Sequence, residues 1–156
     1  MHDESTAPAA QELIRLAAYR HDVLVTLTGE VHPQSGEAPY YVATVEVSGD
    51  LVNLSRPTYV NREDIEEWAQ ALDRIDEAFI IYEGEPDSVD WPASGQDIYL
   101  RVRMSGDPCA VELRDPNAFA SVRLSCDLDQ EWIEASRARV HAVLERLGER
   151  PVPRAG

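Results

Sequence analysis

Carboxylates are the side chains of this sequence with the clearest capacity for chemistry, and they are concentrated in residues 61–91. That segment holds eleven Asp and Glu residues against two Arg residues, a net charge of -9 in a chain whose total is -15. Such a segment can supply acid/base or metal-binding carboxylates, a surface for a basic partner, or the solvated side of a helix and a loop. Acid/base pairs need surroundings that separate their pKa values, and calcium loops need a fixed spacing of acids around a glycine.

The spacing of these acids favours a surface over a catalytic or calcium site. Glu66, Asp73 and Glu77 fall on the side of a predicted helix opposite its apolar stripe, so they are expected to face water. The acids that follow, in residues 83–91, lack the order of ligands and the central glycine of an EF-hand loop. As a partner-binding surface, the segment offers Glu66, Asp73, Glu77, Glu83, Glu85, Asp87, Asp90 and Trp91. A merely solvated face is the other interpretation.

Trp91 stands among acids and a proline, outside any periodic apolar pattern. One interpretation is that its ring folds back over the core as a lid. The other is that it anchors an interface, because buried tryptophans often dominate binding energy. An acidic rim around such an anchor would steer a basic partner toward it.

The other reactive residues form no recognisable catalytic or metal-binding motif. The four histidines have none of the spacings typical of metal ligands: they are His2, His21, His32 and His141. Cys109 and Cys126 do not form a CxxC pair, and we expect Cys126 to be buried, reduced and unreactive. The sequence has no GxSxG elbow, no glycine-rich phosphate loop and no lysine for a Schiff base. We therefore expect a protein without catalysis, metal or cofactor.

The bulk composition bounds the class of protein and its partners. The 156 residues are 44% hydrophobic and 28% charged, which is typical of one globular domain. No apolar run is long enough to span a membrane, and the acidic first residues do not resemble a secretion signal, so a cytoplasmic location is expected. A net charge of -15 repels phosphate backbones and anionic lipid surfaces. A basic protein is the partner that this charge favours.

The pattern of apolar residues predicts the elements that must position these side chains. Alternation predicts strands at residues 12–18, 22–31, 40–47, 51–60, 97–104, 109–115 and 118–126. Pro57 either interrupts the strand at residues 51–60 or makes it an edge strand. Residues 78–84 are predicted as a short buried strand, and residues 32–39 and 85–96 as loops.

Two helices are predicted by their caps and their apolar stripes. Asn61 and Asp129 are suited to cap the helices, with a hydrophobic staple across each cap. The stripe of the first helix consists of Ile65, Trp68, Ala69, Leu72 and Ile75. That of the second consists of Ile133, Ser136, Val140, Val143, Leu144 and Leu147, and Gly148 is suited to end the helix.

Together these elements predict an α+β domain over residues 11–148, with tails at residues 1–10 and 149–156. A mostly antiparallel sheet of about seven strands is expected, with two helices packed on one of its faces. The segments "REDIEEWAQALDRI" and "ASVRLSCDLDQEWIEASRARVHAV" resemble a family of small uncharacterised domains common in high-GC Gram-positive bacteria. The resemblance covers roughly residues 12–147. It supports the fold and implies no established activity or site residue.

Two functions of different class follow from these observations. The first is a non-catalytic binding module that masks a basic partner, in the manner of an immunity protein or antitoxin. The second is a small-molecule-binding or accessory protein with a pocket between sheet and helices, whose lining residues would be Tyr40, Tyr41, Tyr59 and Tyr99. An enzyme of unrecognised type is a third reading.

Overall fold

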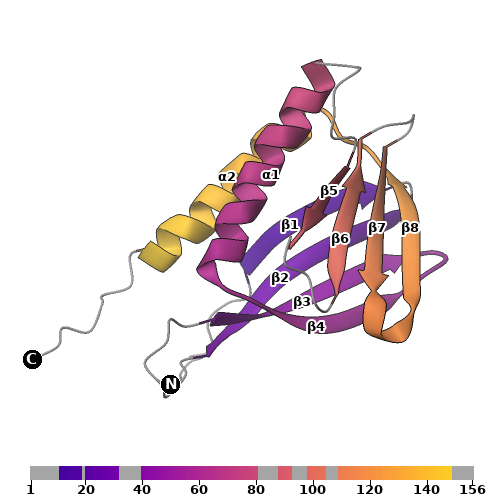
Figure 1. Ribbon diagram of the computed structural model, residues 1–156, viewed down its shortest axis with the longest axis horizontal. Coiled ribbons are helices and arrows are strands. Elements are labelled where there is room, and N and C mark those ends of the chain that lie inside the picture. The colour runs from indigo at the N-terminus through magenta and orange to yellow at the C-terminus, as the bar shows by residue number, and fades with distance from the viewer. Residues whose placement is uncertain are drawn as a thin grey trace, which may run out of the picture.

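The fold contains two four-stranded antiparallel sheets and two helices, as seen in a computed structural model (Figure 1). The structure describes residues 11–18, 20–31, 40–80, 88–92, 98–104 and 109–148. The predicted α+β class and antiparallel pairing are confirmed. The single sheet of about seven strands was wrong, because the eight strands divide into two separate sheets.

Each sheet is a meander in which consecutive strands are neighbours. The first sheet has the order β1 (Gln11–Ala18), β2 (His21–Val31), β3 (Tyr40–Gly49), β4 (Leu54–Val60). The second has the order β5 (Ser88–Trp91), β6 (Tyr99–Arg103), β7 (Cys109–Asp115), β8 (Ala120–Cys126), with the short 3-10 turn η1 (Pro116–Ala118) between the last two. Helix α1 (Arg62–Ile80) connects the sheets, and helix α2 (Gln130–Gly148) follows the second one.

Two local predictions in the acidic segment were wrong. Residues 78–80 continue α1 instead of starting a strand, because a short apolar run does not by itself distinguish a helix end from a buried strand. Residues 88–91 form β5, where a loop was predicted. The alternation of buried and half-buried side chains in this strand, with Val89 and Trp91 buried, spans only four residues. Residues 81–87 lie outside the described part of the chain.

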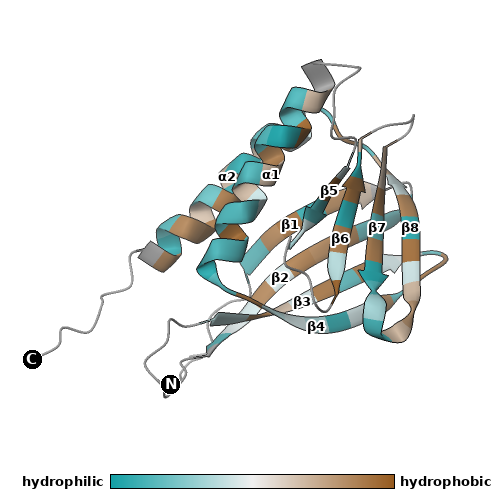
Figure 2. Cartoon of the chain, viewed as in Figure 1, coloured by the Kyte–Doolittle hydropathy of each residue, from teal (hydrophilic) through white to brown (hydrophobic). Residues whose placement is uncertain are grey.

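The core lies between the two sheets and continues under the helices. The second sheet crosses in front of the first in Figure 1, and Figure 2 shows apolar bands along strands of both sheets. The helices pack against each other and beside the sheets, α2 against β1 and α1 against β5, and do not cover one face of a single sheet as expected. One cluster of buried side chains joins all these elements, including Val25, Val45, Leu100, Val111, Leu72 and Val140.

The predicted helix starts are confirmed by their hydrogen bonds. Asn61 Oδ1 accepts from the backbone N–H of Asp64 at 2.8 Å, and Asp64 Oδ2 accepts from the N–H of Asn61 at 3.0 Å. Asp129 Oδ1 accepts from the N–H of Trp132 at 2.8 Å. These side chains satisfy donors that the first turn of a helix leaves without intrahelical partners.

Three tryptophans hold the helices to the sheets. The ring of Trp68, fully buried on α1, makes edge contacts with Trp91 of β5 and Trp132 of α2, at centroid distances of 6.0 Å and 6.4 Å. Trp91 Nε1 donates to the main-chain oxygen of Asp64 at 2.6 Å, and Trp132 Nε1 donates to that of Arg15 at 2.8 Å. Among the residues described, Trp68 Nε1 has no hydrogen-bond partner.

This difference in hydrogen bonding predicts different effects for the same substitution at two buried tryptophans. Trp91→Phe removes a part-buried hydrogen bond to the carbonyl of Asp64, whereas Trp68→Phe removes no such bond. We expect Trp91→Phe to lower the free energy of unfolding by about 1 kcal/mol more than Trp68→Phe does. Urea unfolding of both variants measures the difference, and an equal loss would contradict this role of the Trp91 hydrogen bond.

Candidate functional site

Helix α1 carries the largest described part of the acidic segment. Its residues 62–80 hold seven carboxylates and two arginines, a net charge of -5. Glu66 and Glu77 are exposed, as their positions opposite the apolar stripe predict. Glu66 Oε2 lies 3.1 Å from Arg62 Nε one turn earlier, an exposed ion pair that contributes little to stability.

Asp73 has a partner on the other helix. Its Oδ1 lies 2.8 Å from Nη2 of Arg137 on α2, and the same nitrogen lies 3.2 Å from Asp76 Oδ2. Gln130 Nε2 donates to the other oxygen of Asp76 at 2.8 Å. Asp73 therefore takes part in a polar contact between helices, while its side chain stays accessible from solvent.

The second part of the predicted surface is described only at Asp90 and Trp91, and both are engaged within the fold although β5 packs against α1. Asp90 lies on β5 and accepts two hydrogen bonds from Arg101, at 2.7 Å and 3.0 Å. Trp91 is only 2% exposed and contacts Trp68, so it belongs to the core and not to an exposed rim. The other predicted acids of this part, at positions 83, 85 and 87, lie outside the described residues.

The four tyrosines of the alternative hypothesis do not share one pocket. Tyr41 is buried in the core, where burial raises the pKa of its hydroxyl. The rings of Tyr40 and Tyr59 meet edge to face at 5.6 Å on the β3–β4 pair, and Tyr59 is 60% exposed. Tyr99 lies on β6 in the other sheet and lines a pocket beside the β7–β8 hairpin.

The described histidines and the buried cysteine take part in contacts within the fold. His21 Nε2 accepts from the backbone N–H groups of Leu51 and Val52 at 3.2 Å and 3.3 Å, and His141 lies 3.3 Å from Glu145 on α2. Burial raises the pKa of the Cys126 thiol to about 12, with smaller contributions from Cys109 and Asp127, which disfavours a thiolate nucleophile. Within the described ranges, no group of three or more His, Cys, Asp or Glu could hold a metal ion.

The outer side of the second sheet carries an arginine cluster that the sequence analysis missed. We call it the arginine face; it consists of Arg101, Arg103, Arg114 and Arg123 with the acids Asp90 and Glu112, a net charge of +2. Alternation within β6 places its two arginines on one side. Their proximity to the arginines of β7 and β8 depends on strand pairing, which no local pattern contains.

Glu112 is the centre of the arginine face. Its side chain is 7% exposed, and its oxygens lie 2.5 Å from Arg103 Nε, 2.9 Å from Arg114 Nη1 and 3.8 Å from Arg123 Nε. Burial by itself raises the pKa of this carboxyl, but hydrogen bonds from Arg103 and Arg114 outweigh it and hold the pKa below its usual range. The carboxylate is thus ionised and fixes the positions of the surrounding guanidinium groups.

These features define a two-sheet α+β domain with a negatively charged helix on one side and an arginine face on the second sheet. The chain belongs to DUF5959, a family of unknown function, whose model matches residues 11–148. The resemblance to an uncharacterised domain family is thereby confirmed. No curated protein and no solved structure matched the chain significantly. None of the described helices is long and apolar enough to cross a membrane.

The surroundings of Glu112 predict a pH-dependent contribution to stability. Because its pKa is lower in the folded state, its contribution is present above the unfolded-state pKa, near 4.5, and is lost as pH falls through the folded value. Glu112→Gln should lower the free energy of unfolding at pH 7 by about 2 kcal/mol and flatten its decline below pH 4.5. Denaturant unfolding across pH measures both effects; parallel acid limbs for variant and wild type would refute them.

Proposed function

We propose that this protein is a non-catalytic, cytoplasmic binding module that masks a basic partner protein through the outer face of α1. The net charge of -5 on that helix, with Glu66 and Glu77 exposed on one side, is the observation that carries the proposal. The action is that of an immunity protein or antitoxin, which covers a basic surface without chemistry of its own. We also propose a high-GC Gram-positive origin, from the sequence resemblance alone.

The electrostatics of α1 supports binding of this kind. A helix face of one sign raises the rate at which an oppositely charged surface approaches, and it fixes the register of the complex. The Asp73–Arg137 ion pair is exposed, so a guanidinium or ammonium group of a partner can replace Arg137 beside Asp73. Trp91 plays no part in this surface, because the core holds it.

The absence of catalysis is part of the proposal. Support comes from potentially reactive side chains that are already engaged in contacts within the fold. The His21 ring accepts hydrogen bonds from two backbone N–H groups, and the Cys126 thiol is buried. The alternative of a ligand pocket between sheet and helices has less support, because the four tyrosines proposed to line it lie in separate places.

Charge reversal on α1 tests the proposed function. The partner is first captured with the tagged chain from the cells that encode it, then purified for titration calorimetry at low and high salt. We expect the double variant Glu66→Arg, Glu77→Arg to bind about tenfold more weakly and with a smaller salt dependence, because two favourable charges become repulsive.

The matched control reverses two exposed acids away from α1. Glu46 lies on β3 and Asp127 lies just after β8, and both are exposed. The double variant Glu46→Arg, Asp127→Arg has the same net charge as the test variant and should bind like wild type. Equal affinity of the α1 variant and wild type, or equal weakening by both variants, would exclude the α1 face as the binding surface.

A further inference from the structure

Two sheets have four edge strands, and three of these edges are protected here. At β1, the main-chain oxygens of Arg15 and Ala17 accept hydrogen bonds from Trp132 Nε1 and from the N–H of Asp127, at 2.8 Å and 3.1 Å. At β4, Pro57 removes a backbone donor. At β5, the strand has only four residues and packs against α1. Such devices prevent an edge from pairing with another chain.

Strand β8 is the edge without such a device. Its seven residues pair with β7 in unbroken register, from Cys126 opposite Cys109 to Ala120 opposite Asp115, and they include no proline. In the part of the chain that the structure describes, β8 has a neighbouring strand only on its β7 side. Residues 120–125 are exposed or half-buried. Strand β8 also contacts β1, and the hydrogen bond between the two segments is made by Asp127, just after the strand.

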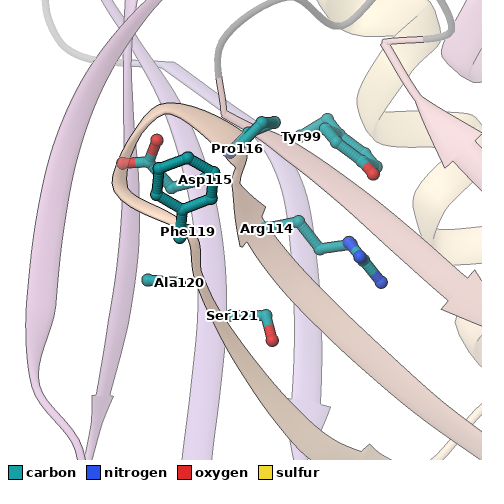
Figure 3. A pocket seen from close by; sticks show the side chains of 7 residues that line it. All are labelled: Tyr99, Arg114, Asp115, Pro116, Phe119, Ala120 and Ser121. Carbon is teal, nitrogen blue, oxygen red and sulfur yellow. The ribbon is translucent and has the colours of Figure 1, made fainter.

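A pocket of about 390 Å³ opens on the outer side of the first residues of β8 (Figure 3). It is lined by Tyr99, Arg114, Asp115, Pro116, Phe119, Ala120 and Ser121. The guanidinium carbon of Arg114 lies 6.0 Å from the centroid of the Tyr99 ring, so a cation and aromatic surface stand side by side. A carboxylate attached to an apolar or aromatic body complements this lining.

Phe119 forms part of the pocket wall and has an unfavourable backbone conformation. Its φ of 53° lies in the left-handed region, which costs free energy for a bulky residue, and its side chain is 96% exposed. The turn is fixed by two hydrogen bonds, from Ala118 N–H to Asp115 Oδ1 at 3.3 Å and from Phe119 N–H to Pro116 O at 3.2 Å. Folding gains little from an apolar ring so placed, and the ring is accessible to a segment bound along β8.

A smaller apolar groove lies on the other side of β8, facing β4. Its volume is about 100 Å³, and its walls include Leu54, Ile98, Leu113 and Val122. Ala120 and Ser121 border both the pocket and the groove. Because side chains of a strand alternate between faces, a segment paired with β8 would place successive side chains toward the pocket and toward the groove.

We propose that β8 is a docking edge for an extended acidic segment of a partner protein, which adds to the second sheet as a further strand. Acidic side chains of the segment contact Arg114, which lines the pocket with Phe119, and Arg123 further along β8, and apolar side chains enter the groove. The positive arginine face in a chain of net charge -15 makes an acidic occupant complementary here. A second copy is disfavoured, because paired β8 strands would bring like charges together; Arg123 is 65% exposed.

The test uses a short synthetic peptide that alternates glutamate with valine, and a control peptide with lysine in place of glutamate. Fluorescence anisotropy measures affinity, and NMR hydrogen exchange follows the amides of residues 120–125. We expect the glutamate peptide to bind and to slow exchange of these amides, and the lysine peptide not to bind. Phe119→Asn should weaken binding about tenfold.

The Asn variant separates a binding role from a structural one. Asn tolerates the left-handed conformation better than Phe does, so Phe119→Asn should leave the free energy of unfolding unchanged or raised while affinity falls. Arg114→Gln should also weaken binding, although it removes a partner of Glu112, and Arg74→Gln on α1 is the matched charge control that should not. The charge-reversed α1 variant should bind the peptide like wild type, which keeps the two proposals separately testable.

Three outcomes overturn the proposal. The first is unchanged exchange at residues 120–125 when the glutamate peptide is saturating. The second is equal affinity of Phe119→Asn and wild type. The third is a protein that is already dimeric in solution, with β8 amides protected in the absence of peptide, since a second copy then occupies the edge.

Discussion

The contact of Trp68 with two other tryptophans is the interaction on which the rest of this structure depends. A sheet with one apolar face must bury that face against another element, so each sheet needs the other and the helices to cover it. Trp68 belongs to the helix that connects the sheets, Trp91 to the first strand of the second sheet, and Trp132 to the final helix. Their packing determines how the two meanders meet around one core.

The position of charge follows from that arrangement. Side chains turned away from the core are acidic on α1, and on the second sheet they are mainly guanidinium groups around the buried Glu112. The net charge of -15 therefore does not mean that the surface is uniformly negative. Opposite signs occupy different elements, and each surface selects a different class of partner.

Local features of the fold could be predicted from the sequence, and features that join distant segments could not. The caps at Asn61 and Asp129 and the stripes of both helices depend on neighbours within a few residues. The ion pair of Asp73 with Arg137 joins residues 64 positions apart, and that of Asp90 with Arg101 depends on the pairing of β5 with β6. The acidic segment, continuous in sequence, is divided between a helix and a strand for this reason.

The candidate sites also divide into features set by local sequence and features that depend on distant segments. The exposure of Glu66 and Glu77 follows from helical periodicity, whereas the β8 edge, its pocket and its groove exist only once two sheets have formed. The pocket beside Phe119 forms only where the turn after β7 meets β6 and β8, which no pattern within that segment contains. The burial of Trp91 likewise needs the position of α1, to which its ring nitrogen is bonded.

The hydrogen bonds that protect the edge of β1 have a consequence for synthesis on the ribosome. Their donors, Trp132 and Asp127, lie more than a hundred residues after the acceptors Arg15 and Ala17. During translation the first sheet therefore emerges with an open edge, and it keeps that edge until the final helix has left the exit tunnel. Until those residues are synthesised, the edge of β1 is exposed to mispairing with other chains.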